Sequence, residues 1–112
     1  MDATIYHNPK CGTSRNVLRI LHEAGIEPEI VEYLKTPLSR DSLADLAQQL
    51  GSVADLLRAK ETLVTTLDLR NAADSTILDA IAAHPILLNR PVVVTKKGTK
   101  ICRPAEVVLT LL

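Results

Sequence analysis

The first 34 residues place a helix pattern between two strand patterns, and this order limits the folds open to the chain. Residues 4–7 predict a strand, and the following loop contains Pro9 and Gly12. Apolar residues then recur at helical spacing up to Gly25: Val17, Leu18, Leu21 and Ala24. The run "EPEIVEYL" (27–34) predicts a second strand. A connection of this length allows a right-handed crossover between two parallel strands.

The middle of the chain, from about residue 38 to 85, is helical by pattern. The segment "TPLSRDSLADLAQQLG" predicts a helix that is capped by Ser39 and ended by Gly51. A shorter helix is predicted in "SVADLLR", and a further one at about 74–84, where Pro85 stops it. The middle third therefore forms a helical insertion.

The last third changes from a helical to an alternating pattern. The runs "RPVVVT" and "TKICR" flank the turn "KKG" and predict a β-hairpin, after which "PAEVVLTLL" predicts a closing helix with Pro104 in its first turn. The complete order predicts one α/β domain over residues 1–112, with a mixed four-stranded sheet flanked by helices. Apart from the insertion, this is the thioredoxin-like order.

Composition excludes several classes of function. Thirteen basic side chains balance thirteen acidic ones, so no excess of positive charge points to nucleic acid or a membrane surface. No apolar run approaches the roughly 20 residues of a membrane helix, and the N-terminus lacks the pattern of a secretory signal. We therefore expect a cytoplasmic protein, in which Cys11 and Cys102 stay reduced. The only aromatic residues are Tyr6 and Tyr33, so aliphatic side chains must build the core.

Cys11 lies in the loop between the first strand and a helix that is predicted to start near Thr13 or Ser14, either of which can act as cap. The first N–H groups of a helix have no partner inside it and carry the positive end of its dipole. They stabilise a thiolate, and the same groups bind oxyanions. Lys10 and Arg15 flank the cysteine and act in the same direction. Cys11 is therefore the candidate nucleophile.

The loop lacks the second cysteine of a dithiol oxidoreductase, because Ser14 occupies the last position of the C-x-x-C spacing. The C-x5-R loop of cysteine phosphatases is also absent, since position 17 is valine. Redox chemistry by a single thiol needs a second thiol from elsewhere, and glutathione is the obvious cytoplasmic donor. Cys102 could supply that second thiol within the chain, but it lies in a strand pattern beside Ile101, so we favour its interpretation as a packing residue.

Three blocks of the sequence, "IYHNPKCGTSRNVL", "HPILLNRPVVV" and "CRPAEVVL", resemble the ArsC-type, glutaredoxin-coupled arsenate reductases. The resemblance runs from Ile5 to the last residue. It implies a thioredoxin-like sheet with a helical insertion, no bound cofactor and no metal. It also implies a mechanism in which the Cys11 thiolate attacks arsenate and glutathione attacks the adduct. Arsenite then leaves, and glutaredoxin resolves the mixed disulfide.

The resemblance also implies roles for particular residues. The catalytic group matches Cys11, His7, Ser14 and Arg15. The three arginines that hold the oxyanion match Arg58, Arg90 and Arg103. Planar, always ionised guanidinium groups suit arsenate or another tetrahedral oxyanion better than ammonium groups do. A cis-proline that faces the active thiol in this fold matches Pro91, and this cis bond is expected from the resemblance alone.

Two other functions remain open from the sequence. The chain is also compatible with a glutathione-dependent thiol reductase that acts on a different small molecule or on a protein mixed disulfide. A third alternative is a protein-binding transcriptional regulator of the Spx type, which shares the fold and binds RNA polymerase. The redox switch of those regulators is a C-x-x-C pair, and Ser14 argues against switching by that route.

Overall fold

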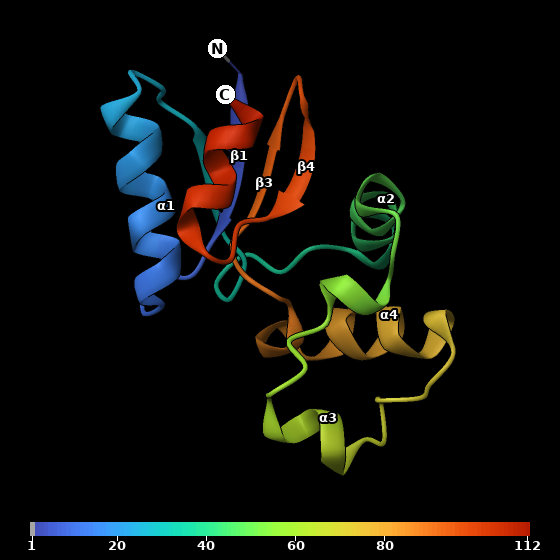
Figure 1. The fold of residues 1–112 in the computed structure, drawn as a ribbon. Coiled ribbons are helices and arrows are strands. Elements are labelled where there is room, and N and C mark those ends of the chain that lie inside the picture. The colour runs from blue at the N-terminus through green and yellow to red at the C-terminus, as the bar shows by residue number, and fades with distance from the viewer. Residues whose placement is uncertain (1) are drawn as a thin grey trace. The chain divides into compact units, whose positions relative to one another are not determined.

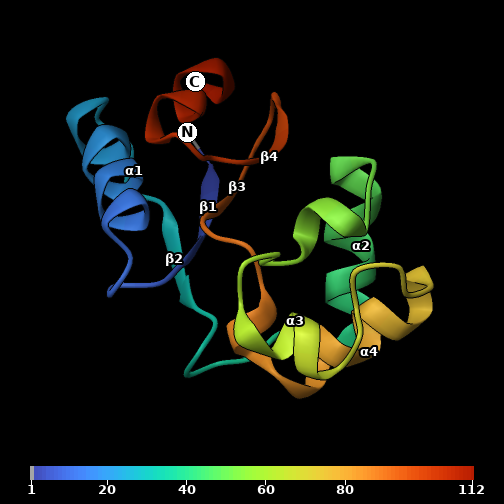
Figure 2. The same ribbon diagram turned by 60° about the horizontal axis from the view of Figure 1, so that its bottom comes forward.

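The computed structural model describes residues 2–112, which form two compact units. We call residues 2–36 and 90–112 the sheet unit, and residues 37–89 the helical unit. Figures 1 and 2 show the ribbon of each unit from two directions. A single domain over residues 1–112, with an insertion at about 38–85, stays a prediction.

The sheet unit contains a mixed four-stranded sheet. Its strands are β1 (Ala3–His7), β2 (Glu29–Glu32), β3 (Val92–Thr95) and β4 (Gly98–Ile101). They lie in the order β2-β1-β3-β4, with β1 parallel to β2 and antiparallel to β3, and with β3 antiparallel to β4. The predicted sheet, its parallel crossover and its C-terminal hairpin are therefore confirmed.

Two helices cover one face of this sheet, α1 (Gly12–Glu23) and the 3-10 helix η3 (Ala105–Leu111). They lie side by side in Figure 1. The closing helix that the sequence predicts is thus a 3-10 helix, and Pro104 precedes it as its N-cap. The core beneath the two helices is built without aromatic residues from Ala3, Ile5, Val17, Leu21, Ile26, Val93, Cys102, Ala105, Val108 and Leu111.

The start of α1 differs from the expectation. The helix begins at Gly12 and its N-cap is Cys11, so the expectation that Thr13 or Ser14 caps it is wrong. The reason is that the Ser14 side chain is fully buried and bonded to groups of β1 and the loop, which takes it away from the helix end. The nucleophile candidate itself occupies the capping position.

The helical unit contains five short helices, and its buried side chains are aliphatic. The helices are α2 (Arg40–Leu50), η1 (Ala54–Leu56), α3 (Thr62–Thr66), α4 (Asp74–Ala83) and η2 (Pro85–Leu87). The predicted cap of α2 is present, because Ser39 Oγ accepts a hydrogen bond from Ser42 N at 3.1 Å. Gly51 ends α2 with φ +85°, a value that favours glycine. The sequence pattern did not predict α3.

Within residues 2–112, none of the helices is both long enough and apolar enough to cross a bilayer.

Candidate active site

The loop between β1 and α1 is held by Asn8. Its carbonyl oxygen accepts a hydrogen bond from Cys11 N at 3.0 Å, and its side-chain Oδ1 accepts one from Lys10 N at 3.0 Å. Pro9, between them, has no N–H. The amides of Lys10 and Cys11 are therefore bonded within the loop, whereas those of Thr13 and Ser14, in the first turn of α1, act on the Cys11 sulfur. Sequence reasoning missed Asn8, although asparagine two residues before a loop amide is a known turn signal.

The Cys11 sulfur is a half-buried free thiol at the N-terminus of α1. Burial raises its pKa, but the backbone N–H of Ser14, the Arg103 side chain, the charge of Arg90 and the N–H of Thr13 lower it, and the lowering prevails. The Cys11 side chain, although it occupies the N-cap position, accepts no hydrogen bond of regular capping geometry. Its stabilisation as thiolate comes from several donors that act together.

Arg103 makes the direct side-chain contact with this sulfur. Its Nη1 lies 3.5 Å from Cys11 Sγ and donates to the Arg90 carbonyl at 3.3 Å. The hairpin register explains the meeting of the two arginines, because Val92 pairs with Ile101 and the same register places residue 90 opposite residue 103. The hairpin thus brings the Arg103 guanidinium into contact with the sulfur and the charge of Arg90 close enough to act on it, from sequence positions about eighty to ninety residues away.

Each of these arginines precedes a cis-proline. The Arg90–Pro91 and Arg103–Pro104 peptide bonds are both cis. The first of these was expected from the family resemblance, and the second was not expected. Cys102 N donates to the Pro91 carbonyl at 3.0 Å, which continues the pairing of the hairpin past β3 and β4.

His7 and Ser14 form a buried polar contact behind the loop. His7 Nδ1 lies 2.6 Å from Ser14 Oγ, and both residues are buried. Burial lowers the pKa of His7; the charge of Glu32 raises it and that of Arg15 lowers it, and the net direction is downward. Within residues 2–112, no hydrogen bond joins His7 to the Cys11 sulfur.

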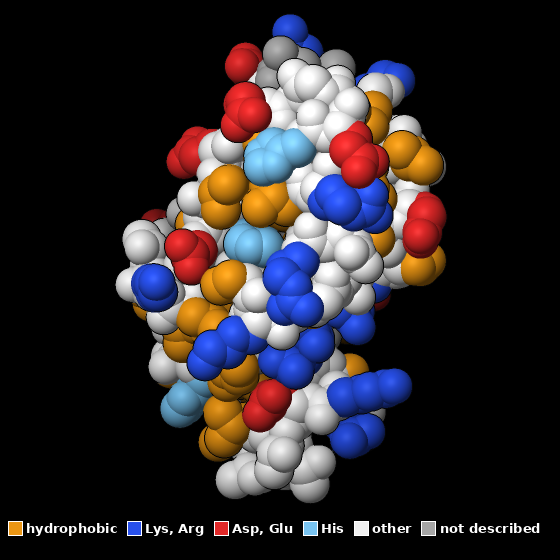
Figure 3. Space-filling view, turned by 90° about the vertical axis from the view of Figure 1, so that its left-hand side faces the viewer, with side chains coloured by type: hydrophobic (Ala, Val, Ile, Leu, Met, Phe, Trp, Pro, Cys, Tyr) orange, Lys and Arg blue, Asp and Glu red, His pale blue; other side chains and the backbone are white. Residues whose placement is uncertain are grey.

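Arg15 makes a hydrogen bond to the loop at the protein surface. Its Nη1 donates to the Pro9 carbonyl at 2.9 Å, and the side chain is exposed. Figure 3 looks onto α1 and shows Lys and Arg side chains gathered on this face. The exposed basic residues Lys10, Arg15 and Arg103 make the surroundings of Cys11 attractive to an anion.

Arg58, the third predicted arginine, belongs to the helical unit and is described within it. Its backbone N donates to the Leu87 carbonyl at 2.7 Å, and its Nε lies 3.9 Å from a carboxylate oxygen of Glu61. About a quarter of its side chain is exposed.

Cys102 has the opposite environment to Cys11. It is completely buried in the core cluster, and burial raises the pKa of its thiol to about 12 although the charge of Lys100 lowers it. Its Sγ lies 3.7 Å from the Lys100 carbonyl. This environment suits a packing residue and keeps the thiol protonated.

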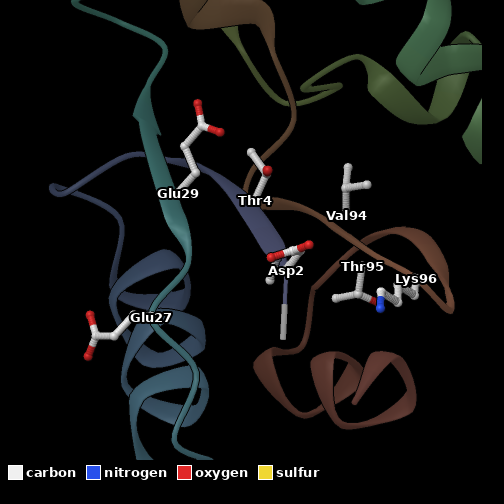
Figure 4. Close-up of a pocket in the computed structure, with 8 residues that line it drawn as sticks. Asp2, Thr4, Glu27, Glu29, Val94, Thr95 and Lys96 are labelled. Carbon is white, nitrogen blue, oxygen red and sulfur yellow. The ribbon is translucent and has the colours of Figure 1, made fainter.

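Other features of the described residues lie away from this chemistry. An open depression of about 470 Å³ is lined by residues that include Asp2, Thr4, Glu29, Val94 and Lys96, at the start of β1 (Figure 4). Cys11 follows the other end of that strand. Among residues 2–112, no group of three or more His, Cys, Asp or Glu side chains is placed to hold a metal ion.

Comparisons with known proteins agree on one family. The model of the ArsC family matches residues 6–111. An arsenate reductase of Escherichia coli is 51% identical over 112 residues, covering 97% of this chain and 79% of its own length. One of Rhizobium meliloti (strain 1021) is 50% identical over 115 residues, covering 100% of this chain and 82% of its own. The solved arsenate reductase from Vibrio cholerae is 41% identical, covers 100% of this chain and 98% of its own, and superposes with a TM-score of 0.94.

Proposed function

The chain belongs to the ArsC family, and from this premise we propose that it is an oxidoreductase that reduces arsenate to arsenite with Cys11 as nucleophile. The observation that carries the proposal is the pairing of an activated sulfur with a guanidinium, Arg103 Nη1 at 3.5 Å from Cys11 Sγ. We infer the substrate from relatives that are named arsenate reductase and are about 50% identical over nearly the whole chain.

The thiolate is the reactive form of Cys11. Because its pKa is lowered, a larger fraction of the thiol is ionised at neutral pH than for an ordinary cysteine. In the first step the sulfur forms a bond to arsenic(V), and an arsenate oxygen leaves as hydroxide or, with a proton, as water. The first-turn amides of α1 and the arginines hold the remaining oxygens.

The second step reduces arsenic. A glutathione thiolate attacks the Cys11 sulfur, the sulfur–arsenic bond breaks, and its electron pair stays on arsenic, which leaves as arsenite. Two sulfurs are oxidised to a mixed disulfide while arsenic gains two electrons, so the step balances. A glutaredoxin thiolate then attacks the glutathione sulfur and returns Cys11 to the thiolate.

Three arginines hold the oxyanion in this proposal. Arg90 and Arg103 act from the ends of the hairpin, beside the sulfur. We include Arg58 because family membership implies it. Guanidinium groups bind tetrahedral oxyanions through paired N–H donors, which ammonium groups lack.

The other predicted site residues complete the loop. Ser14 contributes one of the two backbone N–H groups that lower the Cys11 pKa, Arg15 donates to the Pro9 carbonyl, and His7 contacts Ser14. The reductants, glutathione and glutaredoxin, belong to the reducing cytoplasm, and we propose that the protein acts there.

A coupled assay tests the proposal. NADPH oxidation is followed with glutathione, glutathione reductase, glutaredoxin and arsenate, and each component is left out in turn. We expect turnover that needs arsenate, glutathione and glutaredoxin and that is absent in Cys11→Ser. A wild-type protein that reduces a glutathionylated peptide but not arsenate would show that this is a thiol reductase with another substrate.

A further inference from the structure

Gly12, the first residue of α1, has no reason within the fold to be glycine. The other three glycines have a positive φ and Gly12 does not, so its backbone conformation is open to any residue. Apart from its chain neighbours and the helix backbone, the atom of residues 2–112 nearest to a Cβ built on it is Arg15 Nη2 at 3.7 Å, an ordinary contact. Glycine is also the poorest helix former after proline. Gly12 is exposed, so the space of its missing side chain is open to another molecule.

Arg15 lies beside this space with part of its guanidinium unused. Its Nη1 donates to the Pro9 carbonyl at 2.9 Å, and this is the one hydrogen bond that the guanidinium makes within residues 2–112. Nη2, which faces the place of the missing Cβ, keeps its donors for another acceptor. The hydrogen bond from Arg15 N to the Cys11 carbonyl, at 3.0 Å, places Arg15 one helical turn beyond the cysteine. The surface of α1 beside the sulfur therefore has glycine at its start and an exposed guanidinium one turn along.

The second step of the proposed function needs a surface of this kind. A thiolate that attacks the Cys11 sulfur approaches from the side opposite to the bond that breaks, the bond to arsenic. Arg90 and Arg103 hold the arsenate oxygens in that function, and both come from the hairpin. The reducing thiol must therefore approach by another side, and Gly12 and Arg15 in α1 are not used by the oxyanion.

We propose that Gly12 and Arg15 form the subsite for the reducing thiol, in which Gly12 leaves room for the chain of glutathione and Arg15 Nη2 binds its glycine carboxylate. The cysteine and glycine of an extended glutathione span about 7 Å. This is enough to reach from Cys11 to the next turn of α1, about 5.4 Å along the helix. A guanidinium suits a carboxylate because its N–H donors are charged and lie in one plane. The inference rests on the proposed function in taking glutathione as the reductant.

Thiol–disulfide exchange tests the subsite without arsenate. The Cys11 thiolate attacks one sulfur of oxidised glutathione, a new disulfide forms, and the other half leaves as glutathione thiolate, so atoms and electrons balance. The product is the mixed disulfide that the second step of the proposed function also forms. Intact-protein mass spectrometry follows its rate. Hydroxyethyl disulfide, which is smaller and has no carboxylate, is the reference, and the ratio of the two rates cancels any change in the reactivity of the sulfur itself.

Arg15→Ala tests the carboxylate contact. We expect the ratio of the glutathione rate to the reference rate to fall about two- to fivefold, as for the loss of an exposed ion pair. Arg15→Lys should recover part of this fall, because it keeps the charge. The matched control is Arg19→Ala, which removes an exposed arginine of α1 that pairs with Glu23, and it should leave the ratio unchanged. Equal falls in Arg15→Ala and Arg19→Ala overturn the proposal, because general attraction between charges would explain both.

Gly12→Ala tests the open space. We expect the ratio to fall about tenfold, because the added methyl group occupies the place of the glutathione chain. The midpoint of thermal unfolding should stay the same or rise, since alanine is the better helix former and fits beside Arg15. An unchanged or higher midpoint shows that the fall does not come from misfolding. A wild-type ratio in either Gly12→Ala or Arg15→Ala overturns the proposal.

The exchange assay and the arsenate assay separate this inference from the proposed function. If wild-type protein does not reduce arsenate and the ratio responds as expected, the subsite stands and the proposed substrate is wrong. If arsenate is reduced and the ratio does not respond, the proposed function stands and the subsite is wrong.

Discussion

The loop before α1 and the position just after β4 each hold a cysteine, and the two thiols have opposite properties. Cys11 is half-buried beside backbone N–H groups and two arginines, and its pKa is lowered. Cys102 is fully buried among aliphatic side chains, and its pKa is raised to about 12. Arg103 is the neighbour of Cys102 in sequence, yet its guanidinium contacts Cys11.

The difference shows that reactivity here comes from placement. Desolvation acts on both sulfurs in the same direction, toward the thiol. Only Cys11 also has donors that compensate for it, because it caps a helix and lies opposite the hairpin ends. The same residue type is therefore a nucleophile in one region and a core residue in the other.

The largest expected effect is on turnover when each thiol is removed. Cys11→Ser should reduce arsenate turnover to background even with Cys102 intact, because a serine hydroxyl does not ionise at neutral pH. Cys102→Ala should keep turnover, since that thiol is buried and protonated. The coupled assay on both variants gives the answer. A strong loss of turnover in a folded Cys102→Ala would make the second thiol part of the chemistry.

The next effect concerns the arginine that contacts Cys11. Arg103→Ala should lower kcat/KM for arsenate by about 10- to 150-fold, the equivalent of a charged hydrogen bond of about 1.5–3 kcal/mol. Arg103→Lys should recover part of this, because it keeps the charge and loses the planar fork. Arg19→Ala is the matched control, an exposed arginine on α1 that pairs with Glu23. Equal losses in Arg103→Ala and Arg19→Ala would mean that only the general positive charge matters.

The two thiols should also give stability opposite dependences on pH. The lowered pKa of Cys11 stabilises the fold above the unfolded thiol pKa, about 8.5, and this contribution is lost as pH falls through the folded pKa. The raised pKa of Cys102 stabilises the fold below about 8.5, and this contribution is lost as pH rises toward about 12.

Urea unfolding of wild type, Cys11→Ser and Cys102→Ala across this pH range measures both slopes. Cys11→Ser should lack the rise in unfolding free energy below about pH 8.5, and Cys102→Ala should lack its share of the fall above it. If unfolding free energy depends on pH in the same way for all three proteins, the proposed difference in pKa between the two thiols is wrong.

The smallest expected effect is at the helix cap. At acidic pH, where Cys11 is a thiol, Cys11→Ser should stabilise the protein by about 0.5–1 kcal/mol, because serine caps a helix better than most residues. Ser39→Ala should lower stability by about 1 kcal/mol, since Ser39 already caps α2. Thermal unfolding compares the two. A destabilised Cys11→Ser would mean that the sulfur contributes to the fold as well as to the chemistry.

Local patterns were enough to predict most of the fold. Strand-type runs predicted the four strands, and helical spacing predicted α1, α2 and α4. Ser39 and Gly51 were correctly predicted as the ends of α2. The start of α1 was predicted wrongly because a contact between β1 and α1 decides it: the Ser14 side chain is buried against His7. Local sequence signals do not reveal this contact. The helix α3 was missed because its sequence, "TLVTT", is rich in β-branched residues and too short to show a period.

Local sequence predicted only part of the candidate site. Cys11 follows from its loop, and the hairpin register places Arg90 opposite Arg103. That Arg103 contacts the sulfur, 92 residues away in sequence, depends on how the hairpin packs against β1 and could not be derived from local spacing. Asn8 was missed because its role is carried by backbone groups and one side-chain oxygen in a turn.

The most direct test is alkylation of both cysteines in one sample of wild-type protein. Iodoacetamide labelling across a series of pH values, with each site read by mass spectrometry, compares the two thiols under identical conditions. We predict that Cys11 is labelled with a midpoint below the ordinary thiol value of about 8.5, while Cys102 stays unlabelled until the chain is unfolded. A Cys11 midpoint at or above that value, or labelling of Cys102 at the same rate, would contradict the account.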